Sequence, residues 1–324
     1  MTTGRLGQHA APPNTAYAGQ AVNFPDPVRA SRHPHGVRMD EHGYPDFSPY
    51  ARAAAEIAEP PEGFGVDELR LTDYVSANAA LHAEGHELWA DLRAVATPHG
   101  WTWHHVAHSR RMELVPVEIK ALLRHHGGLA TAAVDHSKRG TRPLQETRPA
   151  HFEVPHDVAV SERQVVEAEE KLGYRLPGAY RAFLKAAGGS APRGVALDAE
   201  LGLLVDQPFF TLRDEPAVND LVYINKCLRD HLTKDYLSVG FVQGGIIAVR
   251  VRGESIGSVW FCAYDDARDR EGMTVHERVG SLLLPCGADF DDFLLRLAGS
   301  PPELETVANL MVDGGFARAV PVKG

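Results

Sequence analysis

Cysteine is scarce in this sequence. The three residues, Cys227, Cys262 and Cys286, are odd in number and form no C-x-x-C pair. This pattern argues against a framework of disulfides and against a zinc site built from thiolates. A reducing compartment fits these free thiols best, so we expect the protein in the cytoplasm.

Long hydrophobic runs are also missing. No stretch approaches the roughly 18 apolar residues that a membrane-spanning helix needs. The first residues, Met1 to His9, are polar and lack the apolar core of a secretory signal, so we expect neither a membrane partner nor a signal in this chain. With 324 residues, 44% of them hydrophobic, the chain is long enough for two globular domains.

Positive charge is in short supply, because the formal net charge is −10. Such a balance is awkward for a nucleic-acid enzyme, since contacts to phosphate supply most of the non-specific affinity. The basic residues do concentrate in one region, and we expect a positive local field there, with Arg110, Arg111 and Arg124 as candidates for binding substrate. The members of this cluster are Arg110, Arg111, Lys120, Arg124, Lys138, Arg139 and Arg142.

Histidines gather in the same region. The pattern predicts a strand over Trp101 to Val106, a second strand over Glu113 to Pro116, and a helix over Val117 to His126 that ends at Gly127-Gly128. Adjacent imidazoles at a strand end, with a third from a following helix, can hold a transition metal and leave one ring nitrogen to deprotonate water. Chance clustering is the alternative, because the chain has 17 histidines.

The second half of the chain has a different pattern. Proline-rich, polar sequence predicts a linker over residues 136–157, and Ser161 to Gln164 then form a capping box that opens a helix. Later apolar runs with a period of two residues predict an antiparallel sheet. We therefore predict an α+β protein with an irregular leader (1–38), a first domain (39–135), the linker, and a second domain (158–324).

Several motifs of the first half occur in the order of a known family, and residues 36–132 resemble toxin nucleases of the HNH and endonuclease VII superfamily with a Trp-His-His motif, which are found at the ends of bacterial polymorphic toxins. The resemblance implies a ββα-metal finger in which His104 and His125 bind the metal and His105 is the general base. The motifs are Gly43-Tyr-Pro-Asp-Phe-Ser-Pro-Tyr50, Asp73 with Ala77-Asn78, Trp103-His104-His105, Arg111-Met-Glu-Leu-Val-Pro116 and His125-x-Gly-Gly128.

Two positions depart from this family. Lys120 and Leu129 stand where the family usually has histidine, and a lysine at neutral pH is a donor and no metal ligand. Three interpretations stay open. His108 or His126 replaces the missing ligand, Lys120 holds phosphate or stabilises the leaving group as a catalytic residue, or the site is inactive.

The resemblance also implies one divalent metal ion as cofactor. Imidazole ligands favour zinc or nickel over magnesium, but the sequence does not choose among the three. Three further polar residues of the region, Asp46, Asp73 and Asn78, are interpreted as caps of turns or helices before any role in the site.

Residues 158–300 resemble the SUKH superfamily of bacterial immunity proteins. The resemblance implies an α+β fold that binds proteins, and many relatives neutralise nuclease toxins. The resemblance to the SUKH superfamily rests on three stretches of the sequence. These are Ser161 to Gly173, Leu176-Pro177-x-x-Tyr180-x-x-Phe183-Leu184 with Gly188-Gly189, and Gly257-Ser-Val-Trp-Phe with Asp265-Asp266. The acids of this half are expected in solvated loops and at helix starts, although an acidic face could cover a basic nuclease groove. These acids are Asp265, Asp266, Asp289, Asp291 and Asp292.

Together the two resemblances indicate a metal-dependent endonuclease of bacterial toxin type, acting on DNA in preference to RNA, whose own SUKH-like domain restrains it. A short tether would hold that domain at roughly millimolar effective concentration. The alternative is a catalytically inactive nuclease relative that acts as an immunity or protein-binding factor.

Overall fold

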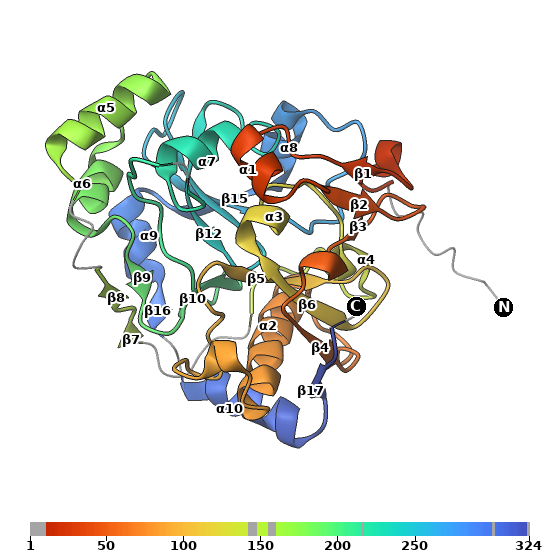
Figure 1. Cartoon of the computed structure of the whole chain (residues 1–324). Coiled ribbons are helices and arrows are strands. Elements are labelled where there is room, and N and C mark those ends of the chain that lie inside the picture. The colour runs from red at the N-terminus through yellow and green to blue at the C-terminus, as the bar shows by residue number, and fades with distance from the viewer. Residues whose placement is uncertain (1–10, 142–147, 155–159, 216, 300–301, 323–324) are drawn as a thin grey trace.

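The architecture was determined from a computed structural model that describes residues 11–141, 148–154, 160–215, 217–299 and 302–322. Helices and antiparallel sheets alternate along the chain, so the α+β class predicted from the sequence is confirmed (Figure 1). Within this described part, no helix is both long and apolar enough to cross a membrane.

The first half is built on a four-stranded antiparallel sheet whose order is β17-β4-β6-β5. The two strands that the sequence predicts around the histidine motif are β5 and β6. They pair as an antiparallel hairpin in which His104 lies opposite Glu113 and His105 opposite Met112. The edge strand β17 comes from the far end of the chain. The strands are β4 (Ala53–Ile57), β5 (Trp101–His105), β6 (Arg111–Pro116) and β17 (Ala317–Val320).

Two helices pack beside this sheet. Helix α2 (Val66–Ala83) contacts β4 and β17, and helix α10 (Pro302–Asp313) packs on α2 through the buried residues Leu304 and Ala308 (Figure 1). The domain bounds predicted from the sequence placed the residues of α10 in the second domain (158–324). In the structure, α10 and β17 complete the N-terminal half instead.

The segment after the hairpin differs from the prediction. Helix α3 (Val117–Lys120) is a single turn, helix α4 (Gly128–Thr131) follows, and the residues between them are not helical. The predicted helix to His126 is therefore wrong beyond Lys120. The two residues that follow this break, Leu122 and Leu123, pack into two different cores.

The predicted irregular leader is more ordered than expected. Residues 1–10 lie outside the described part, but the following segment forms a small sheet, β1-β2-β3, and a helix, α1, that Asp26 caps by accepting from the N–H of Arg29 at 2.9 Å. Phe24 and Val37 are buried there, which fixes the segment to the body. Its elements are η1 (Thr15–Tyr17), β1 (Ala21–Val22), α1 (Pro27–Arg32), β2 (Val37–Met39), β3 (Pro45–Asp46) and η2 (Ser48–Tyr50).

The second half contains the predicted antiparallel sheet, in the order β12-β13-β14-β15, with helices around it. The capping box of Ser161 and Gln164 is present at the start of α5, as the sequence predicts. The elements are α5 (Glu162–Leu172), α6 (Gly178–Ala187), α7 (Leu221–Cys227), β12 (Tyr236–Val242), β13 (Gly245–Arg250), β14 (Val259–Ala263), α8 (Val275–Leu282), β15 (Leu283–Gly287) and α9 (Phe290–Arg296).

Short strands connect the halves. The linker residues 142–147 and 155–157 lie outside the described part, while residues between them pair with strands of the second half. These elements, with the remaining short helix, are η3 (Glu87–Trp89), β7 (Arg148–Pro149), β8 (Phe152–Glu153), β9 (Ala191–Pro192), β10 (Ala196–Asp198), β11 (Leu203–Val205) and β16 (Ala298–Gly299).

The hydrophobic cores cross the boundary between the halves. Val117 and Leu122 belong to the core of the second half, and Leu197 and Leu204 belong to the core of the first. Apolar burial is the main favourable term in folding, so the halves stabilise each other. The two halves therefore share packed cores. The sequence predicted only two domains joined by a linker.

Candidate functional site

Two buried imidazoles meet where β5 ends. His104 comes from β5 and His125 from the non-helical segment before α4, with ring centroids 5.4 Å apart and the Phe47 ring edge-on to both. His125 Nδ1 lies 2.8 Å from the carbonyl oxygen of Leu123. His104 Nδ1 and His125 Nε2 are buried without a hydrogen-bond partner. Orphaned buried nitrogens of this kind are available for a ligand.

Burial sets the protonation of this pair. It lowers the pKa of His104 well below the usual value, and it lowers the pKa of His125 to about 4, with the charge of Lys120 acting in the same direction. Both rings are therefore neutral at pH 7. Only the neutral imidazole has a lone pair with which to bind a metal or accept a proton.

The next histidine has a carboxylate partner. His105 Nε2 lies 3.1 Å from Asp73 Oδ2, and Asp73 Oδ1 accepts from Arg110 Nη2 at 2.6 Å. Burial lowers the pKa of His105, and the Asp73 contact opposes this shift. A carboxylate on one ring nitrogen fixes the tautomer and leaves the other nitrogen to accept a proton. Asp73 lies inside α2, so its interpretation as a cap is wrong.

The tryptophan of the motif is anchored from the same helix. Trp103 Nε1 donates to Asn78 Oδ1 at 2.7 Å, and Asn78 Nδ2 donates to the carbonyl oxygen of Val95 at 2.9 Å. Asn78 therefore positions β5 and caps no helix. Asp46, in contrast, accepts from the N–H of Ser48 at 3.0 Å, which confirms its role in a turn.

Lys120 is buried beside the imidazoles. Its Nζ lies 5.5 Å from the centroid of the Tyr264 ring, and burial lowers its pKa to about 8. At pH 7 it is still mostly protonated. A cation therefore occupies the position at which the resemblance implies a histidine ligand of the metal.

The other two candidate ligands differ in position. His126 is buried, with Nε2 lacking a partner, whereas His108 is exposed in the β5–β6 turn at a φ of 54° and packs against Tyr44. Across the described residues, no group of three or more His, Cys, Asp or Glu side chains is arranged to hold a metal ion. In this cluster, the nitrogens of His104 and His125 that have no hydrogen-bond partner are the ones available to a ligand.

The three arginine candidates are engaged inside the protein. Arg110 pairs with Asp73, Arg111 with Glu113 at 3.1 Å, and Arg124 with Asp269 at 2.5 Å. Their positive charges are thus neutralised locally, and the expected positive field is weakened in this conformation.

A carboxylate from the second half closes the site. Asp265 Oδ1 accepts from the backbone N–H of Gly127 at 2.7 Å and of Ala130 at 3.0 Å, and Oδ2 accepts from Leu129 at 2.9 Å. A Cβ on Gly127 would lie 2.5 Å from the carbonyl oxygen of His105 and 2.8 Å from Asp265 Oδ2, so glycine allows this close approach.

The sequence alone does not show that Asp265 binds the backbone of residues 127–130. Asp265 and Asp266 are 5% and 8% exposed, so their placement in a solvated loop is wrong, whereas Asp289 does begin helix α9 as expected. The acidic pair in sequence was the available signal, but its partners lie more than 130 residues away and only the folded chain joins them.

Comparison with known families finds a different match in each half of the chain. Residues 93–135 match a family described as a nuclease of the HNH/ENDO VII superfamily with conserved WHH, and residues 159–296 match the SMI1/KNR4 family (SUKH-1). No curated protein matches the chain. The segment that contains the histidines is thus similar to these nucleases, and the region that contains Asp265 is similar to the SUKH-1 family.

Proposed function

We propose that this protein is a metal-dependent endonuclease that hydrolyses phosphodiester bonds of DNA and that its SUKH region holds it in a closed, restrained state in a reducing cytoplasm. The main support is the arrangement of His105 and Asp73 beside the neutral pair His104 and His125. This set combines a base oriented by a carboxylate with two free imidazole nitrogens. The three histidines lie inside the segment that matches nucleases, and Asp73 is supplied by helix α2, outside that segment.

The chemistry assigns one role to each group. His104 and His125 would hold a divalent ion, which when bound stabilises negative charge on phosphate oxygens. His105 donates a hydrogen bond from Nε2–H to Asp73, keeps that proton, and takes a proton from the attacking water at Nδ1, which generates the hydroxide nucleophile. Lys120, protonated at pH 7, adds positive charge near the developing charge of the phosphate.

The restraint follows from burial. His104, His105 and His125 are at most 3% exposed, so a nucleic-acid strand does not reach them in this conformation. Asp265 fixes the Gly127-Gly128 loop over them through three hydrogen bonds. Cleavage therefore requires this contact to open.

The test uses the full chain, because α10 and β17 complete the N-terminal sheet and a fragment would lose them. Asp265→Ala removes the three hydrogen bonds to the loop, and Asp266→Ala is the matched control, since Asp266 pairs with Arg268 on its own loop. Supercoiled plasmid and a structured RNA are each incubated with both variants and with zinc, nickel, magnesium or manganese.

We expect Asp265→Ala to nick the plasmid at least tenfold faster than the unaltered protein and Asp266→Ala to leave the rate unchanged. Circular dichroism and thermal unfolding confirm that both variants are folded. A folded Asp265→Ala variant that cuts neither substrate with any of the four metals contradicts the proposal.

The second candidate is an inactive nuclease relative that binds other proteins. It is favoured by the cation of Lys120 beside the imidazoles and by the internal pairing of the three arginines. Titration of zinc into the Asp265→Ala variant separates the two. An active site binds one ion with an affinity that falls on acidification, because protons compete for the imidazoles, whereas an inactive relative binds none.

A further inference from the structure

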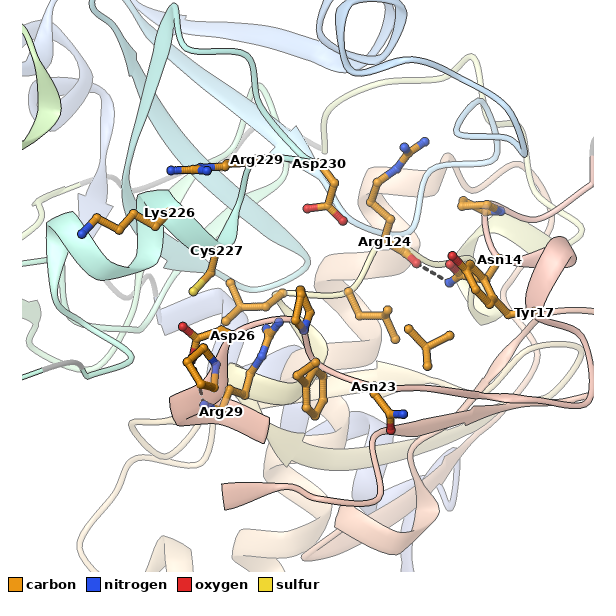
Figure 2. Close-up of a pocket in the computed structure, with 17 residues that line it drawn as sticks. Asn14, Tyr17, Asn23, Asp26, Arg29, Arg124, Lys226, Cys227, Arg229 and Asp230 are labelled. Atoms are coloured by element: carbon orange, nitrogen blue, oxygen red, sulfur yellow. Dashed lines mark hydrogen bonds between the residues drawn. The ribbon is translucent and has the colours of Figure 1, made fainter. Parts of the chain in front are cut away.

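A cavity of about 780 Å³ lies away from the histidines, between the N-terminal segment, the residues before His125, and helix α7. Its size is within the range of pockets that bind small molecules. Figure 2 shows Arg29 rising into this space from below, Asp230 pointing into it from above, and Asn14 and Tyr17 closing one side.

Arg29 is the unusual group of this cavity. Its side chain is only 2% exposed, yet Nε and Nη1 have no hydrogen-bond partner among the described residues. The guanidinium carbon lies 4.2 Å from the centroid of the Phe24 ring, which fixes its plane. Burying a cation with unsatisfied donors is costly, so a group that satisfies them is expected.

The carboxylates that line the cavity do not fill this role. Asp26 accepts from the hydroxyl of Tyr223 at 2.6 Å and from the backbone N–H of Arg29, and Asp230 lies 2.7 Å from His231 Nδ1. Neither carboxylate is hydrogen-bonded to the Arg29 guanidinium, and both already have other partners.

The remaining lining favours an anion with an organic part. Lys226 and Arg229 are exposed at the rim and add positive charge, while Arg124 already pairs with Asp269. Apolar side chains form much of the wall. These are Pro13, Val22, Phe24, Pro25, Pro27, Leu122 and Leu123.

We propose that this cavity is a binding site for a small organic phosphate, with the Arg29 guanidinium donating to phosphate oxygens and the organic part against the apolar wall. Arginine is suited to this task because it is always charged and its hydrogen bonds to phosphate are assisted by that charge. This proposal is independent of nuclease activity, because its test measures the binding of a ligand and not cleavage.

The first experiment is calorimetric titration of the full-length protein with inorganic phosphate, adenosine 5′-monophosphate, adenosine and acetate. We expect the monophosphate to bind with a Kd below 1 mM, inorganic phosphate more weakly, and adenosine and acetate not at all. No binding of either phosphate compound, or equal binding of adenosine or acetate, overturns the assignment.

The variant Arg29→Met removes the guanidinium and keeps an apolar chain of similar length. Arg32→Gln on the same helix is the matched control, because it removes one exposed positive charge that does not line the cavity. We expect at least tenfold weaker binding of the monophosphate by Arg29→Met and no change for Arg32→Gln. Equal affinity of a folded Arg29→Met variant places the ligand elsewhere and overturns the proposal.

A second readout needs no variant and serves if Arg29→Met does not fold. Cys227 lines the cavity and is partly exposed, whereas Cys262 and Cys286 are buried. Mass spectrometry measures alkylation of each thiol by iodoacetamide. We expect adenosine 5′-monophosphate to slow alkylation of Cys227 at least threefold, and an unchanged rate at saturating monophosphate overturns the proposed location.

Discussion

At the scale of single residues, the site depends on which groups are charged after burial. His104 and His125 are neutral because burial lowers the pKa of each, while Lys120 beside them keeps its proton at pH 7. The sequence predicts the adjacency of these side chains and the role of His105. It does not predict their protonation, because desolvation depends on the residues that cover them.

The base assignment predicts a loss of cleavage. In the Asp265→Ala background, His105→Ala should lower the rate of plasmid nicking roughly 100- to 10,000-fold, while the bound metal stays constant. His276→Ala, an exposed histidine of α8, is the control and should leave the rate unchanged. Loss of metal in His105→Ala would instead make His105 a ligand.

Because Lys120 is buried, we expect its replacement by an apolar residue to stabilise the protein. Because burial lowers the pKa of Lys120 from 10.5 to about 8, the unfolded chain binds more protons than the folded chain between these values. Stability therefore rises with pH across that window. We expect Lys120→Met to raise the free energy of unfolding by about 1–4 kcal/mol at pH 7, and the gain to shrink as the pH approaches 10.5.

Urea denaturation at pH 7, 8.5 and 10 measures this effect. Lys171→Met replaces an exposed lysine of α5 and should change stability by less than about 0.5 kcal/mol at each pH. A destabilised Lys120→Met variant at pH 7 would show that the ammonium group contributes favourable contacts that outweigh its burial.

At the scale of elements, local patterns predicted type better than extent. The sequence predicted α5 from its capping box and strands at the positions of β5 and β6, and the structure confirms these elements. It failed at α3, which ends at Lys120, and the residues after it, Leu122 and Leu123, pack into separate cores. Propensity is local, whereas that packing is tertiary.

Helix α10 offers a matched pair of substitutions. Leu304 is 6% exposed and packs in the core of the first half, while Leu310 on the same helix is 63% exposed. Leu304→Ala should destabilise the protein by about 2–5 kcal/mol through the cavity that it leaves, and Leu310→Ala by less than about 0.5 kcal/mol. Equal effects in urea denaturation would show that α10 does not pack on α2 in solution.

At the scale of the whole molecule, polar groups also join the two halves. Gln243 Nε2 donates to Asp206 Oδ2 at 2.8 Å, and the Thr102 hydroxyl lies 3.2 Å from Gln243 Oε1. Gln207 Oε1 accepts from the N–H of Gly100 at 2.8 Å. These bonds tie the start of β5 to the second half, the part of the chain that we propose restrains the site.

Asp206 makes this connection sensitive to pH. Burial raises its pKa from 3.8 to about 7, despite hydrogen bonds that act in the opposite direction. Its folded pKa lies above its unfolded one, so its contribution to stability is complete below about pH 4 and is lost as the pH rises through 7. Asp206→Asn should flatten the fall in the free energy of unfolding between pH 4 and 7.

The measurement is urea denaturation at unit steps from pH 4 to 8. Asp214→Asn, at an exposed carboxylate, should keep the slope of the unaltered protein. Parallel curves for Asp206→Asn and the unaltered protein would mean that Asp206 does not titrate in this window.

The sequence by itself determined the local patterns: the Trp-His-His strand, the capping box, the scarcity of cysteine and the two family resemblances. These are properties of neighbouring residues. Only the tertiary structure decided that Asp73 partners His105, that β17 completes the first sheet and that Asp265 closes the histidine site. Each of these contacts joins positions far apart in the chain, and burial and hydrogen bonding between them exist only once the chain has folded.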